Sequence, residues 1–206
     1  MRIVTRATAI NNLKSYIGQD LHDLAIAHGI TTYETGKQNK GWKGLVLERL
    51  AGLDTNVSKA PNGLSYELKS VSFRYVGGKL VPKETMAITM INTEELKKSE
   101  FFNSHCWAKL KSLVFCAVMW DGKNAKTAKL LSVTSLDYAE DDALIKEIKE
   151  DYDFIRQKLI NAGFESLTGS DGKWIQARTK GAGHGSESRA FYARTGLVKE
   201  IFKTAL

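Results

Sequence analysis

The chain is poor in residues that mark several protein classes. Its 206 residues include only two cysteines, two prolines and four histidines. Two cysteines are too few for a disulfide framework, and Cys106 and Cys116 lie in or beside apolar segments, so we expect reduced core residues and no zinc site. Internal repeats and long linkers are also missing. We therefore expect a single domain over residues 1–206.

Long hydrophobic runs are absent as well. No segment approaches the roughly 18 apolar residues that a membrane-spanning helix requires. The first residues, Met1 to Arg6, lack the apolar stretch of a secretory signal. These absences predict a cytoplasmic protein with no membrane partner.

Charge is present but unevenly distributed. The formal net charge is +7, yet the segment from Asp137 to Asp153 holds eight acidic residues against Lys146 and Lys149. The rest of the chain has 28 basic and 15 acidic residues, a net charge of +13. This segregation predicts an acidic helix that faces away from a basic surface suited to nucleic acid. A basic protein with no such partner is the alternative that charge alone leaves open.

The periodicity of apolar residues predicts a mixed α/β architecture with helices packed on a sheet. We expect helices over residues 13–29, 40–52, 93–99, 103–110 and 139–162, and a terminal helix capped by Thr195. We expect strands over residues 64–73, 80–91, 113–120, 173–178 and 189–194. Gly77-Gly78 and Asp121-Gly122 are expected hairpin turns.

The most informative polar residues are Glu67 and Lys69, which lie two apart on a predicted strand and so share one face. Alone, this pair is usually a solvated strand face. It also matches half of a phosphodiesterase site, in which a carboxylate holds Mg²⁺ and a lysine orients water or stabilises charge. Glu48, near the end of a predicted helix, could add a third group.

Five ordered segments resemble the PD-(D/E)xK nucleases, and more closely the family of the MutH mismatch-repair nicking endonuclease and GATC-cutting restriction enzymes. The segments, spread over most of the chain, are Asn39 to Glu48, Tyr66 to Lys69, Glu84 to Met86, Ser104 to Lys111, and Ile175 to Ala182 with Phe191-Tyr192. The resemblance implies a restriction-endonuclease-like fold, a mixed central sheet flanked by helices, with two lobes around a DNA cleft. Residues 1–135 would form mainly the catalytic lobe and residues 136–206 mainly the DNA-recognition lobe.

Carried over by position, the resemblance implies that Glu48 and Glu67 bind Mg²⁺, that Lys69 is the catalytic lysine and that Lys109 is an additional active-site lysine. The family has a metal-binding aspartate seven residues before the glutamate, where this chain has Ala60. Asp54 lies thirteen residues before Glu67 and is a poorer substitute. Ala60 is interpreted either as an inactivating Asp-to-Ala replacement or as the mark of a naturally inert relative.

The same resemblance implies DNA contacts at Lys40, Gly41, Arg178, Lys180 and Tyr192. Arginine bidentate to guanine is the commonest specific base contact, although Arg178 and Lys180 could also bind phosphates without reading bases. The tyrosine that Tyr192 matches lies near the adenine of GATC in the family and senses its methylation; a half-buried strand aromatic is the structural alternative. His105 and His184 are predicted to be non-catalytic.

Three functions remain open from the sequence. The first is a sequence-specific, Mg²⁺-dependent endonuclease acting on double-stranded DNA, with a type II restriction enzyme at a GATC-like site favoured over a repair nickase. A restriction enzyme would act as a homodimer on DNA or by sequential nicks, whereas a repair enzyme would need a MutL-like activator. The second is a non-catalytic DNA-binding relative, and the third is a basic structural protein.

Overall fold

The computed structural model describes residues 4–34, 37–39, 41–53, 65–120, 127–180 and 188–204. The helices are α1 (Arg6–Lys14), α2 (Leu21–Ala27), α3 (Trp42–Ala51), α4 (Thr93–Lys98), α5 (His105–Leu110), α6 (Ala143–Ala162) and α7 (Thr195–Lys203). Short 3-10 turns lie at Phe101–Asn103 and Phe164–Ser166. The strands are β1 (Tyr33–Glu34), β2 (Lys37–Gln38), β3 (Glu67–Val76), β4 (Lys79–Pro82), β5 (Met86–Met90), β6 (Ser112–Met119), β7 (Lys129–Asp137), β8 (Ile175–Thr179) and β9 (Arg189–Ala193).

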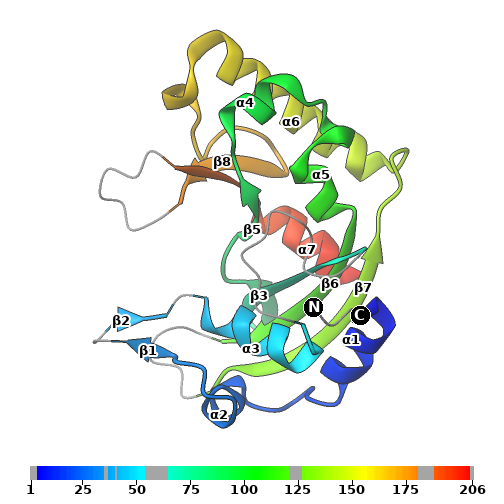
Figure 1. The fold of residues 1–206 in the computed structure, drawn as a ribbon, viewed down its shortest axis with the longest axis vertical. Coiled ribbons are helices and arrows are strands. Elements are labelled where there is room, and N and C mark those ends of the chain that lie inside the picture. Colours follow the sequence, from blue (N-terminus) through cyan, green and yellow to red (C-terminus); the bar gives the residue numbers. More distant parts are fainter. Residues whose placement is uncertain are drawn as a thin grey trace.

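A four-stranded mixed sheet with the order β4-β3-β6-β7 forms the centre of the fold. β3 and β6 are parallel and place Glu67 opposite Leu113, while β4 and β7 run antiparallel at the two edges. β6 is buried from Ser112 to Val118, because packed residues cover both faces of the sheet. The predicted architecture of a mixed central sheet flanked by helices is confirmed (Figure 1).

A second, antiparallel sheet with the order β5-β9-β8 lies beside the first, in the upper part of Figure 1. The predicted late strand pair is confirmed as β8 and β9, with Gln176 opposite Tyr192. The prediction of one strand over residues 80–91 is wrong, because β4 and β5 belong to different sheets. β4 ends at Pro82; one further hydrogen bond joins the N–H of Lys83 to the carbonyl of Ser72, and the chain then crosses to the second sheet.

The N-terminal helix is also divided. The predicted helix over residues 13–29 is wrong: α1 ends at Lys14 and α2 begins at Leu21. Asp20 separates them, since its carboxylate caps α2 at the N–H of His22 and also accepts from the N–H of Ala128. A polar residue that caps a helix cannot also continue the preceding one.

Strand β7 was missed by the periodicity argument. Its buried apolar residues Leu130, Val133 and Leu136 are spaced by three, which is not the alternation of a regular strand. A register shift in the pairing of β6 with β7 puts Leu130 and Val133 in the same core, because the extra residue lies between them, whereas Leu136 packs in the core on the other face of the sheet.

Helix ends follow the predictions only in part. α3 ends, as predicted, at Gly52, which is in the left-handed conformation (φ 84°). The helix predicted from residue 103 begins at His105 instead, because Ser104 caps α5 through the N–H of Trp107. The cap predicted at Thr195 is wrong: α7 begins at Thr195, and Arg194 takes the cap position without a side-chain hydrogen bond. The expected turn at Asp121-Gly122 lies outside the described residues.

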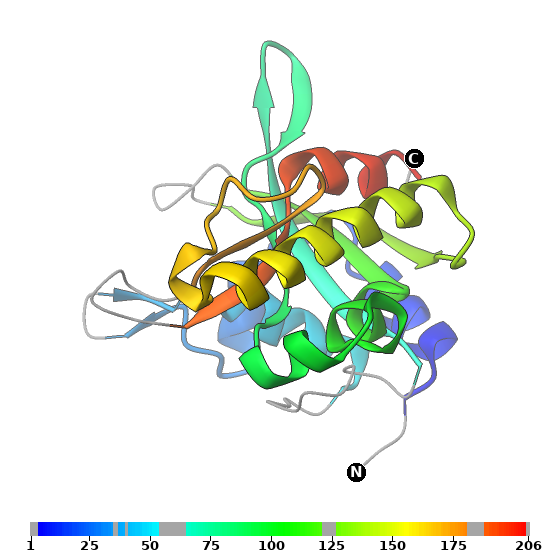
Figure 2. The ribbon, with the colours of Figure 1, turned by 90° about the horizontal axis from the view of Figure 1, so that it is seen from above.

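The acidic segment is only partly a solvated face. It runs along the outside of the upper part as α6 (Figure 2), and Glu147 pairs on the surface with Lys173. Asp151 instead turns inward with 8% exposure and accepts three backbone N–H groups. Cys106 and Cys116 are buried free thiols, as predicted. Within the ranges given above, no helix is long and apolar enough to cross a membrane.

Candidate active site

Glu67 lies at the first residue of β3, between two lysine side chains. The Lys69 Nζ is 2.9 Å and the Lys109 Nζ 3.2 Å from the same carboxylate oxygen, Oε1 of Glu67. Alternation along β3 puts Glu67 and Lys69 on one face, and α5 delivers Lys109 just before the chain enters the neighbouring parallel strand β6. The structure therefore brings together three of the residues that the sequence singled out.

This cluster is largely removed from water. The side chains of Glu67, Lys69 and Lys109 are 4%, 16% and 13% exposed. Burial lowers the pKa of Lys69, partly opposed by the nearby Glu67 carboxylate, and the charges of Lys109 and Lys180 lower it further. A lysine with a lowered pKa is better suited to orient or deprotonate a water molecule, because its proton is held less tightly. Its Nζ also donates to the carbonyl of Ile88 at 3.2 Å.

Lys180 acts on this cluster from the other sheet. Its side chain is exposed just beyond the end of β8, and its backbone N–H donates to the carbonyl of Ser188. Its charge is close enough to lower the pKa of Lys69. A residue predicted as a DNA contact therefore lies within electrostatic range of the carboxylate and lysine pair.

The candidate metal ligands are only partly described. Glu48 is half-buried near the end of α3, which packs against β3. Ala60 lies outside the described residues, and among those described no group of three or more His, Cys, Asp or Glu could hold a metal ion. Mg²⁺ is usually bound by one or two carboxylates and completes its shell with water and substrate phosphates. Glu67 is one carboxylate of this kind in the described cluster.

The predicted recognition residues form a second group. Arg178 lies over the ring of Tyr192, with 5.2 Å from its guanidinium carbon to the ring centroid, and its Nη1 is 3.4 Å from Thr85 Oγ1. Arg178 is exposed and Tyr192 half-buried. Gly41 is exposed before the first residue of α3, while Lys40 and His184 lie outside the described residues. His105 is exposed at the first residue of α5, as predicted.

Sequence reasoning missed a polar network on the opposite face of the central sheet. Lys43, only 8% exposed, donates to Ser72 Oγ and lies 3.8 Å from a carboxylate oxygen of Glu84. Lys43 Nζ also lies 3.7 Å above the ring of Trp120, which Lys83 approaches at 4.2 Å. The only signal in the sequence was a lysine on the apolar stripe of α3, where most positions are buried.

Lys43 makes stability depend on pH. Burial lowers the pKa of Lys43 from 10.5 to about 8 although the Glu84 charge opposes the shift. Below pH 8 Lys43 is charged in both the folded and the unfolded chain, so the cost of burying this charge lowers the stability in full. Between pH 8 and 10.5 only the unfolded chain keeps the proton, so stability rises with pH by about 3 kcal/mol in total.

We expect this rise to disappear in Lys43→Met. Urea unfolding at pH 7 and pH 10 should show that the wild-type chain gains about 2 kcal/mol relative to the variant as the pH increases. Lys79→Met, at an exposed position on β4, is the matched control and should follow the wild-type profile. Parallel profiles for wild type and Lys43→Met would show that Lys43 keeps an ordinary pKa.

The mixed sheet with β3 and β6 parallel, flanked by helices and carrying a buried carboxylate and two lysines at one strand end, defines the class: a restriction-endonuclease-like α/β protein. The family described as "DNA mismatch repair enzyme MutH" matches residues 54–151. Those residues include Glu67, Lys69 and Lys109. These observations, with the relatives described next, show that the chain is similar to the MutH-like endonuclease family.

The relatives carry the same description. A "DNA mismatch repair protein MutH" of Escherichia coli O17:K52:H18 (strain UMN026 / ExPEC) is 25% identical over 179 residues, covering 86% of this chain and 76% of the relative. The protein of the same description from Shigella flexneri serotype 5b (strain 8401) is 24% identical over the same shares. The comparisons therefore favour the mismatch-repair alternative over the type II restriction enzyme that the sequence argument preferred.

Proposed function

We propose that this protein is a DNA endonuclease of the mismatch-repair type, which nicks double-stranded DNA at a GATC-like site. The observation that carries the proposal is the Glu67 carboxylate held between Lys69 and Lys109 at the start of β3. A buried acid flanked by two ammonium groups is suited to phosphodiester hydrolysis, which needs a positioned water and neutralisation of the charge that develops on the phosphate. The similarity to the MutH mismatch-repair family supports DNA as the substrate.

Each residue of the site has a separate role in this proposal. Lys69, whose lowered pKa favours the neutral amine, orients the attacking water and takes its proton on Nζ. Lys109 stabilises the negative charge that develops on the phosphate oxygens. Glu67 and Glu48 would hold Mg²⁺, which when bound supplies charge neutralisation and a more acidic water.

Recognition of the sequence would come from the second sheet. Arg178 would donate to a guanine edge while its stacking on Tyr192 holds it in place. Tyr192 would lie near the adenine and respond to its methylation. Lys180, Lys40 and Gly41 would contact the backbone. In this arrangement residues 1–135 serve mainly catalysis and residues 136–206 mainly recognition, although β5 of the first part pairs with β9 of the second.

The distinction between a repair nickase and a restriction enzyme lies in the product and the partner. A repair enzyme acts on one strand and responds to a MutL-like activator, whereas a restriction enzyme cuts both strands as a homodimer or in sequential steps. The 25% identity to mismatch-repair proteins over 86% of the chain supports the first possibility.

We expect Ala60→Asp to raise the nicking rate by about 100-fold or more, because a third carboxylate would stabilise the metal-bound transition state by about 3 kcal/mol. The assay incubates the chain as it stands and the Ala60→Asp protein with Mg²⁺ and plasmids that differ in adenine methylation. The ends are then mapped. Nicks on one strand at unmethylated GATC sites would support the repair role, and paired cuts the restriction role.

Ala60 itself favours a second candidate, a non-catalytic DNA-binding relative. A chain that binds GATC duplexes more tightly than scrambled ones, and gains no cleavage from Ala60→Asp, would belong to this class. Equal binding to both duplexes across a salt series would instead indicate a basic protein without sequence preference.

A further inference from the structure

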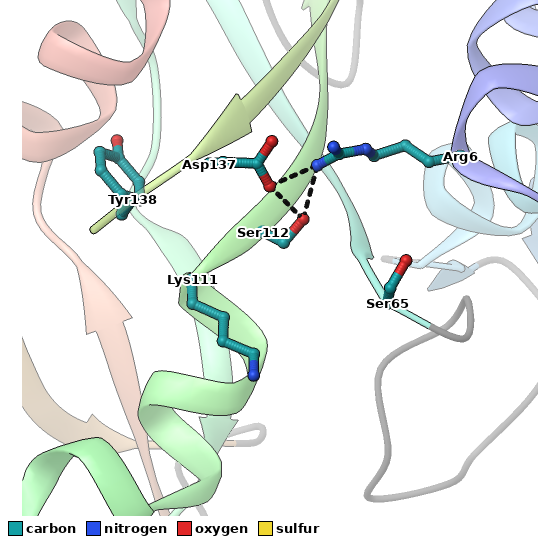
Figure 3. Close-up of a pocket in the computed structure, with 6 residues that line it drawn as sticks. All are labelled: Arg6, Ser65, Lys111, Ser112, Asp137 and Tyr138. Atoms are coloured by element: carbon teal, nitrogen blue, oxygen red, sulfur yellow. Dashed lines mark hydrogen bonds and ion pairs between the residues drawn. The ribbon is translucent and has the colours of Figure 1, made fainter. Parts of the chain in front are cut away.

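A polar pocket of about 270 Å³ lies where β3 and β6 begin and β7 ends. Figure 3 shows its six lining residues, which come from the start of α1, the chain just before β3, the start of β6 and the end of β7. The lining residues are Arg6, Ser65, Lys111, Ser112, Asp137 and Tyr138. All except Asp137 carry hydrogen-bond donors on their side chains.

The charges in the pocket do not cancel. Arg6 Nη1 lies 2.5 Å from Asp137 Oδ1, and Ser112 Oγ also donates to that oxygen at 2.8 Å. This pair raises the pKa of Arg6 and lowers that of Asp137, so both stay ionised and neutralise each other. Lys111 is exposed, extends away from the pair in Figure 3 and makes no ion pair with any residue that the structure describes.

Ser65 adds a neutral donor to this charge. It is exposed and presents a hydroxyl, whereas the hydroxyl of Tyr138 points away from the other five side chains in Figure 3. A pocket with one uncompensated ammonium and a hydroxyl donor fits a phosphate group.

The position of the pocket relative to Glu67 suggests which phosphate it would bind. Ser65 precedes Glu67 by two residues, and Lys111 follows Lys109 by two. Two residues span at most about 7 Å, the length that they have in an extended strand. Each nucleotide of one DNA strand advances about 3.4 Å along the helix axis. A phosphate one or two nucleotides from the group at Glu67 would therefore come within reach.

We propose that Lys111, with Ser65, forms a subsite for a DNA backbone phosphate one or two nucleotides from the scissile phosphate. The subsite rests on the proposed function, because it needs a nucleic-acid strand across Glu67. It fixes the register of that strand, and Arg6 keeps Asp137 from repelling it. Lys111 would be a binding residue that aligns the substrate.

The test uses the chain as it stands, without divalent metal, so that binding is measured apart from cleavage. We expect Lys111→Met to weaken binding of a GATC duplex about 5-fold to 10-fold and to reduce the salt slope by about 0.9, the loss of one phosphate contact. Asp137→Asn removes the only carboxylate among the lining residues and should not weaken binding. Lys146→Met, exposed on the outer helix α6, is the matched control and should leave both quantities unchanged.

A methylphosphonate scan locates the contact. A neutral linkage at one position near the scissile phosphate should weaken the wild type about 5-fold to 10-fold and leave Lys111→Met unaffected, whereas linkages elsewhere should affect both proteins equally. Equal losses at every position would overturn the subsite while leaving the proposed function intact. A chain that binds no DNA would overturn the proposed function, and the subsite with it.

Inorganic phosphate tests whether the pocket binds a free anion instead of a phosphate of the DNA backbone. If millimolar phosphate raises the thermal midpoint of the wild type but not of Lys111→Met, and the variant binds DNA normally, then the pocket takes a free anion and the backbone subsite is wrong. We expect phosphate to compete with DNA for the wild type. In Lys111→Met this competition should be lost together with the DNA affinity.

Discussion

Replacing Glu67 with glutamine in the Ala60→Asp protein is expected to lower the rate of DNA cleavage about 1000-fold or more. Glutamine keeps the shape of the side chain but loses the charge that would hold Mg²⁺, and it no longer neutralises Lys69 and Lys109, which lie 2.9 Å and 3.2 Å from Oε1. A loss of this size corresponds to about 4 kcal/mol of transition-state stabilisation. Single-turnover nicking of a plasmid measures the rate directly.

The same substitution should affect folding much less than it affects cleavage. Two buried ammonium groups would lose their carboxylate partner, and Lys69 can respond by releasing its proton because burial already lowers its pKa. The thermal midpoint therefore serves as the folding check. Glu94→Gln, at a side chain 66% exposed on α4, is the matched control for the loss of one acid and should leave the rate unchanged.

DNA affinity separates a catalytic loss from a binding loss. Removing a negative charge from a surface that faces phosphates should maintain or strengthen binding, so Glu67→Gln should bind at least as tightly as its parent. If the variant binds DNA and still cleaves within about 10-fold of its parent, then Glu67 is not part of the reaction and the site must be sought elsewhere.

Local rules predicted the parts of the fold that depend on neighbouring residues. The helices at residues 93–98 and 105–110, capped by Asn92 and Ser104, and the end of α3 at Gly52 depend on a few consecutive residues and lie close to where they were expected. The alternation that put Glu67 and Lys69 on one face is equally local. Each of these features follows from backbone geometry that no distant contact needs to supply.

Features that depend on distant pairing were not predictable in this way. The assignment of β4 and β5 to different sheets is determined by partners far along the chain, β3 for one and β9 for the other. The proximity of Lys109 to Glu67 came from the family resemblance, because residues 42 apart meet only through the parallel pairing of β3 and β6. Lys43 was missed because the carboxylate near it, Glu84, lies on the segment that joins those two sheets.

The acidic segment shows how composition can mislead about a single residue. Asp151 was grouped with solvated acids, yet its carboxylate accepts from the backbone N–H groups of Lys173, Trp174 and Ile175 at 2.7, 2.5 and 2.9 Å. It therefore secures the turn that leads into β8, the strand that carries Arg178. Charge counting cannot detect this, because the partners are backbone groups.

We expect Asp151→Ala to lower the free energy of unfolding by about 3 to 5 kcal/mol, since three largely buried N–H groups would lose their acceptor at once. Solvent cannot easily replace it, because the turn is tight: a Cβ at Gly172 would lie 2.1 Å from the carbonyl oxygen of Ile175 and 3.0 Å from Asp151 Cγ. Urea denaturation measures the change. Asp153→Ala is the control, because its carboxylate is 43% exposed and pairs only with Lys149 on the same helix, so the expected loss is about 0.5 kcal/mol or less.

We expect Asp151→Ala to impair DNA recognition more than catalysis. Loss of the Asp151 acceptor frees the start of β8, and Arg178 lies three residues beyond Ile175 on that strand. Glu67, Lys69 and Lys109 belong to β3 and α5, which Asp151 does not secure. At a temperature where Asp151→Ala remains folded, its preference for GATC over scrambled duplexes should fall more than its total DNA affinity. An equal fall in both would mean that the turn supports the whole fold and has no particular effect on recognition.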